Sequence, residues 1–341
     1  MGEKTPLRRR LLEHSIGLLV GLVILGMFEQ KYRLKEGGLQ STTVFSPVGI
    51  KYAYAQPPEP GFVRGYVHGM TPPPKRDGVR RIIAVGDSIT FGLGVDRESA
   101  WPAALQRAVP NTEVLNLAIC GWDAEQVVTL ITQVLPQWKP DLIIWGSFPN
   151  DPNPTYLMWG ATEKVPIFVG TQIPEPVRIL PEGMSLALTR VSAMFRQYQA
   201  GRLAKAQQEG LQLGADMPWY EAQLARLRTW TQASGIPVEV LAIPAHTQAA
   251  PERCAEVWPA HDCEKQAQRY SLMMQSLGRS GLSVTDGQKI YAASGRPHFM
   301  VRPGESAGQG AWENDAEHPT AAGHTVLSMG LVPGVRSALS R

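Results

Sequence analysis

The stretch RIIAVGDSIT, residues 81–90, decides the fold, because a short apolar run ends there in glycine, aspartate and serine. The run RIIAV shows no alternation of apolar and polar residues, which is typical of a strand buried on both faces of a parallel sheet. Small polar residues directly after such a strand predict a tight turn with Ser88 at its tip. They also suit an ordinary turn and helix cap, since Asp and Ser both accept hydrogen bonds from amides at a helix start. The tripeptide alone leaves the role of Ser88 open.

The same pattern continues downstream, where short apolar runs alternate with helical stretches. Further strands are predicted at EVLNLA (113–118), DLIIWGS (141–147), PVEVLAIP (237–244) and LSVTD (282–286), and helices at 100–109 and 124–138. Strands of this length separated by helices predict an α/β fold with a central parallel sheet covered on both faces. In such sheets, functional groups gather in the loops at the carboxyl ends of the strands.

The first 35 residues differ in composition from the rest. A basic head precedes an almost uncharged stretch over residues 11–28, which as a helix spans about 27 Å, close to the roughly 30 Å of a bilayer's hydrocarbon. A cleaved signal peptide has a similar pattern, but no small-residue cleavage site follows the stretch directly. We therefore favour a cytoplasmic tail and single transmembrane anchor over residues 1–35, followed by an extended Gly- and Pro-rich linker over residues 36–79.

Composition limits the partners and the compartment. Of the 341 residues, 43% are hydrophobic, and 33 basic against 30 acidic residues give a net charge of +3, so nucleic acid is not an expected partner.

For Cys254 and Cys263 we favour a disulfide outside the cytoplasm over free thiols. Zinc is less favoured, because His246 and His261 lack ligand spacing to the cysteines. We expect a membrane-anchored chain whose main domain is periplasmic or extracellular.

A long insert, residues 152–235, separates the third predicted strand from the fourth. It opens with a Pro-rich loop and continues into runs with apolar residues at helical spacing, over residues 185–210 and 218–235. We expect most of these helices to pack on one face of the sheet. Part of the loop over residues 155–183 is expected to cover the strand ends.

Other strand ends carry groups that complement Ser88. Gly121 follows the second strand, and a glycine lets its backbone amide approach a ligand closely. Asn150 follows the third strand and offers a side-chain amide. Near the carboxyl end, NDAEHPTAAGH (314–324) brings Asp315 and His318 onto one short loop. A serine nucleophile requires a base, a group that orients the base, and donors for an oxyanion, and these positions supply all three.

Four segments in this order, VGDSIT, NLAICGW, GSFPNDP and NDAEHPTAAGH, resemble the sequence blocks of the SGNH hydrolases, also called GDSL esterases and lipases. The resemblance covers about residues 80–335. It implies a three-layer α/β/α flavodoxin-like sandwich of the SGNH-hydrolase type over residues 80–341, with no metal or organic cofactor. It also implies that Ser88 is the nucleophile, His318 the base, Asp315 its orienting partner, and that the amides of Ser88 and Gly121 and the Asn150 side chain form the oxyanion hole.

Two departures from the family pattern stand out. Ile89 replaces the leucine that gives the motif its name, with similar volume. Three residues separate Gly146 from Asn150, where many members have one, so Ser147 is the alternative to Asn150.

The remaining residues near the motifs receive structural roles. Trp122 and Trp145 are expected in the core rather than stacked on a sugar, Cys120 and His324 are expected to be structural, Asp87 to brace the turn, and Asp151 and Glu317 to be surface or supporting acids.

The implied chemistry is acyl transfer through an acyl-enzyme. The amino-terminal anchor resembles that of single-pass SGNH proteins of bacterial envelopes, which implies a serine esterase that removes O-acyl groups, O-acetyl in particular, from an envelope carbohydrate. Two alternatives remain open. One is an O-acyltransferase that passes the group to an exported polysaccharide together with membrane-bound polysaccharide-modification partners. The other is an inactive glycan-binding or assembly protein.

Overall fold

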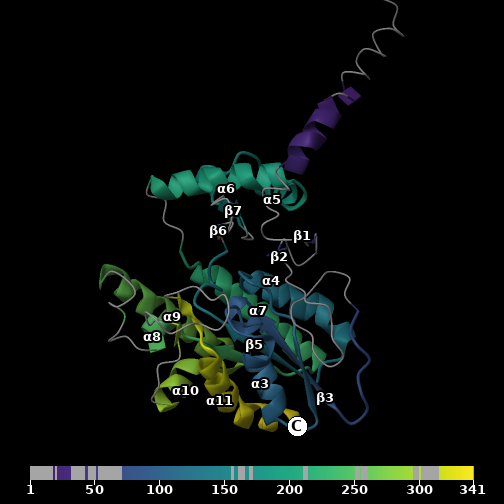
Figure 1. Ribbon diagram of the computed structural model, residues 1–341, viewed down its shortest axis with the longest axis vertical. Helices are drawn as coiled ribbons and strands as arrows, with labels where there is room; N and C mark the ends of the chain where they lie inside the picture. Colours follow the sequence, from purple (N-terminus) through teal and green to yellow (C-terminus); the bar gives the residue numbers. More distant parts are fainter. Residues whose placement is uncertain are drawn as a thin grey trace, which may run out of the picture. The chain divides into compact units, whose positions relative to one another are not determined.

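The protein is described by a computed structural model (Figure 1), which places residues 18–19, 21–31, 43–44, 51–52, 71–154, 157–159, 166–168, 172–209, 214–249, 254, 260–294, 299–300 and 315–340. The chain divides into two compact units. The smaller unit comprises Met1–Gln40, Leu157–Phe168 and Ile173–Leu211. The larger comprises Ser41–Tyr156, Val169–Gln172 and Gln212–Arg341.

A five-stranded sheet forms the centre of the larger unit. Its strands are β3 (Arg80–Gly86), β4 (Thr112–Asn116), β5 (Leu142–Ser147), β8 (Val238–Ala242) and β9 (Ser283–Asp286). They lie in the order β4-β3-β5-β8-β9, and all four pairings are parallel. In order of appearance along the chain this is 2-1-3-4-5, the flavodoxin-like order. All five predicted strands and the predicted parallel sheet are confirmed.

Helices cover both faces of this sheet, because its strands are apolar on both sides. Along β3, Ile83 and Val85 face one core and Ile82 and Ala84 the other, as the period of two in a strand requires. The first core is closed by α4 (Ala124–Thr129), α7 (Met217–Ser234) and α9 (Ala260–Ser280). The second is closed by α3 (Trp101–Ala108), α10 (Gly287–Ser294) and α11 (Ala321–Leu339). The three-layer architecture follows.

Two predicted elements differ in detail. The helix expected over residues 124–138 is α-helical only to Thr129, and then continues as a π-helix, η3 (Leu130–Val134), and a 3-10 helix, η4 (Leu135–Trp138). Pro136 has no N–H with which to extend the α-helical hydrogen bonds. The segment expected to be a loop around His318 is instead a short strand, β11 (Asp315–Pro319), paired antiparallel with β10 (Phe299–Met300). Pairing with a distant segment is not visible in the local sequence.

Short elements complete the larger unit. A two-residue antiparallel pair, β1 (Thr43–Val44) and β2 (Lys51–Tyr52), falls within the predicted linker. Three short helices follow strand ends or precede longer helices: α2 (Ser88–Phe91), η2 (Arg97–Ser99) and α8 (His246–Ala249).

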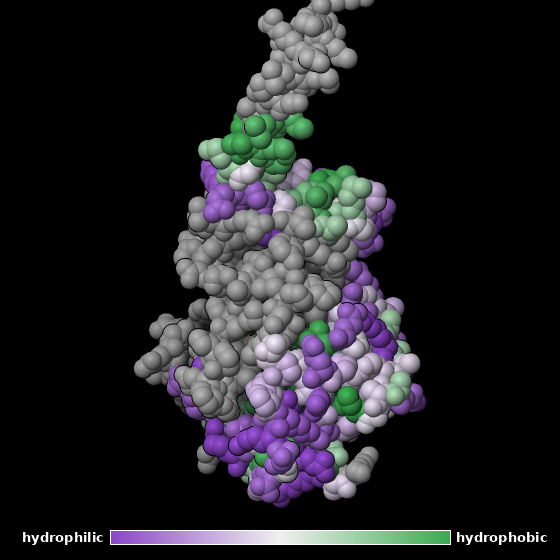
Figure 2. Space-filling model, turned by 90° about the vertical axis from the view of Figure 1, so that its right-hand side faces the viewer, coloured by the Kyte–Doolittle hydropathy of each residue, from purple (hydrophilic) through white to green (hydrophobic). Residues whose placement is uncertain are grey.

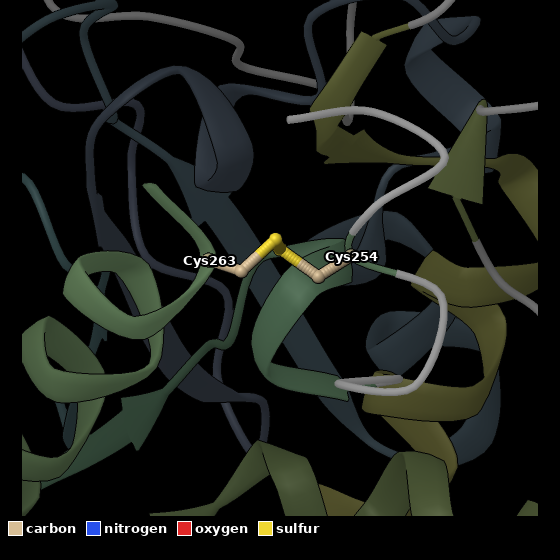
Figure 3. Close-up of a disulfide and its surroundings, with 2 residues drawn as sticks. All are labelled: Cys254 and Cys263. Atoms are coloured by element: carbon tan, nitrogen blue, oxygen red, sulfur yellow. A yellow bond between two sulfur atoms is a disulfide. The ribbon is translucent and has the colours of Figure 1, made fainter. Parts of the chain in front are cut away.

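The predicted disulfide is present. Cys254 and Cys263 are bonded to one another, with their Cα atoms 5.8 Å apart, and the bond ties the segment after α8 to the first turns of α9 (Figure 3). A disulfide suits an oxidising compartment, as the sequence indicated.

The smaller unit contains most of the insert. It has an antiparallel pair, β6 (Leu157–Trp159) with β7 (Pro166–Phe168), a 3-10 turn, η5 (Glu175–Val177), and the helices α5 (Glu182–Val191) and α6 (Ala193–Gln208). The single helix expected over residues 185–210 is therefore broken at Ser192. Of the two predicted insert helices, α7 packs on the sheet as expected, whereas α5 and α6 belong to the smaller unit.

The predicted membrane helix over residues 11–28 lies partly outside the described residues. Residues 18–19 and 21–31 are helical. Among the helices that are described, none combines the length and the apolar character of a bilayer-spanning segment.

Candidate active site

Ser88 lies at the tip of a tight turn between β3 and α2. The Asp87 carboxylate caps α2 by accepting a hydrogen bond from the Ile89 amide at 2.9 Å, and Gly92 ends the helix in the left-handed conformation. Asp87 is fully buried, as are Ile89 and Thr90, whereas Ser88 between them is partly exposed. The turn thus leaves Ser88 partly accessible, while the residues on either side of it are buried.

Two glycines allow α2 to lie against the strand ends. Gly86 of β3 and Gly146 of β5 are paired in the sheet, and the side chain of Thr90 fits against both. A Cβ on Gly146 would lie 2.0 Å from Thr90 Oγ1, and a Cβ on Gly86 would lie 2.5 Å from the Gly146 carbonyl oxygen. Gly86 also has φ +148°, which disfavours any side chain. Both glycines are required for this turn.

We expect Gly146→Ala to destabilise the larger unit by about 1–3 kcal/mol, the usual cost of an overpacked site. Adding Thr90→Ala removes the hydroxyl in the way and is expected to restore part of the loss. Urea unfolding followed by the fluorescence of the buried core tryptophans measures both. Gly278→Ala in α9 is the control, because its Cβ meets nothing within 4 Å and alanine favours a helix. Equal stability of Gly146→Ala and wild type would contradict the packing argument.

His318 lies directly against Ser88. Its Nε2 is 2.9 Å from Ser88 Oγ, although 230 positions separate the two residues. β11 supplies the histidine and contacts α2, and His318 is buried to 6% exposure. Asp315 belongs to the same strand, but its side chain lies outside the described residues. A hydroxyl hydrogen-bonded to an imidazole is the arrangement by which a base activates a serine.

Gly121 and Asn150 follow the two strands that flank β3. Gly121 lies in the turn after β4 and has φ +72°. Just before this turn, the Ile119 amide donates a hydrogen bond to the Gly86 carbonyl, which keeps the segment beside the end of β3. Asn150 lies just after β5. Ser88, Gly121 and Asn150 share one property: each is partly exposed between two buried neighbours. Three strand ends thus each present one accessible residue.

Asn116, at the end of β4, links this strand to α2, a role that its sequence context did not indicate. Its side-chain amide donates to the Thr90 carbonyl at 2.8 Å, and its side-chain oxygen accepts from the Ala118 amide at 3.2 Å. Its signal in the sequence is a lone polar residue within the apolar run EVLNLA. Asn116 links the turn that carries Gly121 to the helix that carries Ser88.

No protein-family model and no curated protein matches the sequence. Among solved structures, a lipolytic protein of the G-D-S-L family from Veillonella parvula is 12% identical, with a TM-score of 0.41 and coverage of 75% of this chain and 97% of that chain. A carbohydrate acetylesterase family member from Sinorhizobium meliloti is 16% identical, with a TM-score of 0.38 and coverage of 77% and 100%. A catalytic mutant of an acetylxylan esterase from Geobacillus stearothermophilus is 14% identical, with a TM-score of 0.42 and coverage of 75% and 94%.

The four sequence blocks meet in the structure. The first three follow β3, β4 and β5, which are neighbours in the sheet, and the fourth places His318 against Ser88. The chain resembles the SGNH hydrolases. As β3 lies between β4 and β5, its carboxyl end is the topological switch point of the sheet, where ligands bind in folds of this kind.

Ser147, the alternative to Asn150, is held in the core. Its hydroxyl is fully buried and lies 3.0 Å from the Tyr220 hydroxyl of α7 and 3.6 Å from the Met273 sulfur of α9, both in the core on one face of the sheet. Its side chain also interacts with the buried Asp151 carboxylate, and not with Asp87 beside Ser88. The Asn150 side chain instead interacts with the Asp87 carboxylate, next to Ser88. Between Asn150 and Ser147, this geometry therefore favours Asn150 as the candidate side-chain donor to an oxyanion.

Two buried acids lie next to Ser88 and Asn150: Asp87 and Asp151. Burial raises the pKa of Asp87 to about 6, while hydrogen bonds from the Ile89 amide and the Asn150 side chain and the nearby His318 oppose the rise. Burial, together with the charge of Asp87, raises the pKa of Asp151 well above its ordinary value. Asp151 was expected to be a surface or supporting acid; it is fully buried and accepts a hydrogen bond from the Phe148 amide at 3.2 Å.

The raised pKa of Asp87 has a consequence for stability. Since the folded protein holds this proton up to about pH 6 and an unfolded Asp releases it near 3.8, stability falls as pH rises through that window. Across this window, ionisation of the buried Asp87 carboxyl lowers the free energy of unfolding by on the order of 3 kcal/mol. We expect Asp87→Asn to flatten the decline between pH 4 and pH 6, measured by urea unfolding at each pH. Asp216→Asn, at the partly exposed N-cap of α7, is the control, and an unchanged slope in Asp87→Asn would contradict the assignment.

The other residues near the motifs have the structural roles that the sequence indicated. Trp122 and Trp145 are buried in the core, so neither offers a face to a sugar. Cys120 packs with Phe91 beneath the turn, and His324 accepts a hydrogen bond from the Trp101 amide at 3.3 Å. Glu317 is exposed. Among the residues that are described, no group of three His, Cys, Asp or Glu side chains is placed to hold a metal ion.

Proposed function

We propose that the protein is a serine ester hydrolase of the SGNH type. The observation that carries this proposal is the 2.9 Å approach of His318 Nε2 to Ser88 Oγ at the switch point of the parallel sheet. A part-exposed serine at the tip of a turn, bonded to a largely buried imidazole, suits a nucleophile and its base.

The proposed mechanism uses these groups in two steps. His318 takes the proton of Ser88 as the serine oxygen attacks the ester carbonyl, and the Asp315 carboxylate orients and stabilises the imidazole. The amides of Ser88 and Gly121 and the side-chain amide of Asn150 bind the oxyanion that develops. The imidazolium then protonates the departing alcohol. Water, activated by the same histidine, hydrolyses the acyl-enzyme and restores Ser88.

For the substrate we propose an O-acylated carbohydrate of the cell envelope, with acetyl as the acyl group. We further propose that residues 11–28 anchor the chain in the membrane and that the larger unit lies outside the cytoplasm. Support comes from the exposed apolar side chains of residues 18–28 and from the Cys254–Cys263 disulfide, which suits an oxidising compartment.

A fluorophosphonate probe tests the hydrolase proposal directly. We expect it to label wild-type protein at Ser88, with p-nitrophenyl acetate protecting against the label. Hydrolysis of that ester is then followed with and without an oligosaccharide acceptor, with the product masses recorded. Acetylated oligosaccharide would assign the acyl-enzyme to transfer instead of hydrolysis. A native protein that the probe does not label would overturn both activities and favour a glycan-binding protein.

A further inference from the structure

The amino-terminal helix exposes large apolar side chains in every direction. Leu18, Leu19, Leu22, Val23, Ile24, Leu25, Met27 and Phe28 are each between 48% and 69% exposed. Figure 2 shows this helix in green, the colour of hydrophobic residues. Consecutive helical positions are 100° apart, so the unbroken run from residue 22 to residue 25 covers the whole circumference.

The distribution of these side chains indicates what covers them. A groove on a protein partner, or on a second copy of this chain, covers one stripe of a helix and leaves the opposite side exposed. A helix that is apolar on all sides is covered all round only inside a large core or in lipid. The occupant that fits is therefore the hydrocarbon of a bilayer.

Glu29 fixes the end of this apolar helix to the insert. Its carboxylate accepts hydrogen bonds from the Ser192 hydroxyl at 2.8 Å, from the Ala193 amide at 2.8 Å and from the Met194 amide at 3.3 Å. These donors form the junction between α5 and the first turn of α6, where a carboxylate also complements the helix dipole. Glu29 directly follows Phe28, the last of the exposed apolar residues.

This contact determines where the insert lies relative to the lipid. Only the Glu29 side chain separates the apolar helix from the start of α6. The edge of the hydrocarbon layer that would cover the apolar helix therefore lies close to the start of α6. In Figure 1, α6 begins near the end of this helix and leads away in a different direction, so it does not continue the helix's line. With the apolar helix inserted in a bilayer, as proposed above, a helix in that position would lie along the membrane surface and would not enter the bilayer.

We propose that α5 and α6 form a platform on the membrane surface, which Glu29 holds at the end of the inserted helix. This inference rests on the membrane anchoring proposed above and is independent of the esterase activity. The platform exposes one apolar and one aromatic side chain suited to the interfacial layer: Met184 of α5 and Tyr198 of α6 are 55% and 54% exposed.

The test places a fluorophore on the platform. Cys120 is buried and Cys254 is bonded to Cys263, so a new surface cysteine receives the label. Met184→Cys in α5 is labelled with an environment-sensitive dye. The full chain is reconstituted into vesicles of phosphatidylethanolamine and phosphatidylglycerol that contain a lipid with a spin label near its head group. We expect strong quenching at position 184 in these vesicles and none in matched vesicles without the spin-labelled lipid.

Glu29→Ala is then added to the Met184→Cys protein, with Gln30→Ala as the matched neighbour. Flotation with the vesicles is expected for both, because the apolar helix is unchanged, but quenching at position 184 should fall several-fold in Glu29→Ala only. A vesicle-bound wild type without quenching at 184, or equal quenching in Glu29→Ala, overturns the platform. Shielding of the label without vesicles overturns it in favour of a second copy. Protein that does not float refutes the anchoring and the platform, whereas labelling of Ser88 by fluorophosphonate is unaffected.

Discussion

Replacing Ser88 by alanine is expected to lower the turnover of p-nitrophenyl acetate on the order of 10⁶-fold, because the acyl-enzyme then has no oxygen on which to form. The change is structurally mild. Ser88 is partly exposed, and it is the Asp87 carboxylate, not the serine hydroxyl, that caps α2. We therefore expect the free energy of unfolding of Ser88→Ala to stay within about 0.5 kcal/mol of wild type.

Two comparisons make this result specific. Ser337→Ala changes an exposed serine of α11 and should leave turnover unchanged. The double variant Ser88→Ala with His318→Ala should be no slower than Ser88→Ala alone, since residues that act as one unit do not contribute additively. Ester hydrolysis that survives in purified Ser88→Ala protein would exclude Ser88 as the nucleophile.

The layers of the fold were predictable because the three inner strands, β3, β5 and β8, are buried on both faces. Runs such as RIIAV and DLIIWGS have no polar alternation, and this pattern arises where helices cover both sides of a sheet. The helical insert was less predictable. The runs that became α6 and α7 both have apolar residues at helical spacing, but periodicity shows only that a helix buries one face and not which element covers it. Thus α7 packs on the sheet while α6 joins the smaller unit.

The candidate site could be predicted as far as residue types at strand ends. Gly86 directly follows an apolar run, Ser88 and Asn150 follow such runs within three residues, and the topology of a parallel sheet brings such positions to one edge. The buried acids could not be predicted, because an aspartate in a polar loop is usually solvated. Asp151 is buried because the loop after β5 packs against the start of α4, where the Ala124 amide donates to the Asp151 carbonyl at 3.1 Å. That contact joins segments with no sequence signal between them.

The second large effect concerns the oxyanion donor. Asn150→Ala is expected to reduce the turnover number about 10²-fold to 10³-fold, the usual cost of one lost oxyanion donor, with little change in KM. The binding of substrate before reaction does not use this hydrogen bond fully, because the negative charge develops only in the transition state. Initial rates over a range of p-nitrophenyl acetate concentrations separate the two constants.

Ser147→Ala is the variant that decides between the two donors near this strand end. The Ser147 hydroxyl contacts Tyr220 and Met273 within the core and also the buried Asp151 carboxylate, so its loss is expected to lower stability by about 1 kcal/mol and to leave turnover close to wild type. Asn150→Asp provides a near-isosteric check: it removes the amide donor and adds a carboxylate beside Asp87, so we expect it to lose as much turnover as Asn150→Ala. The reverse pattern, with turnover lost in Ser147→Ala and kept in both Asn150 variants, would move the oxyanion hole to the serine.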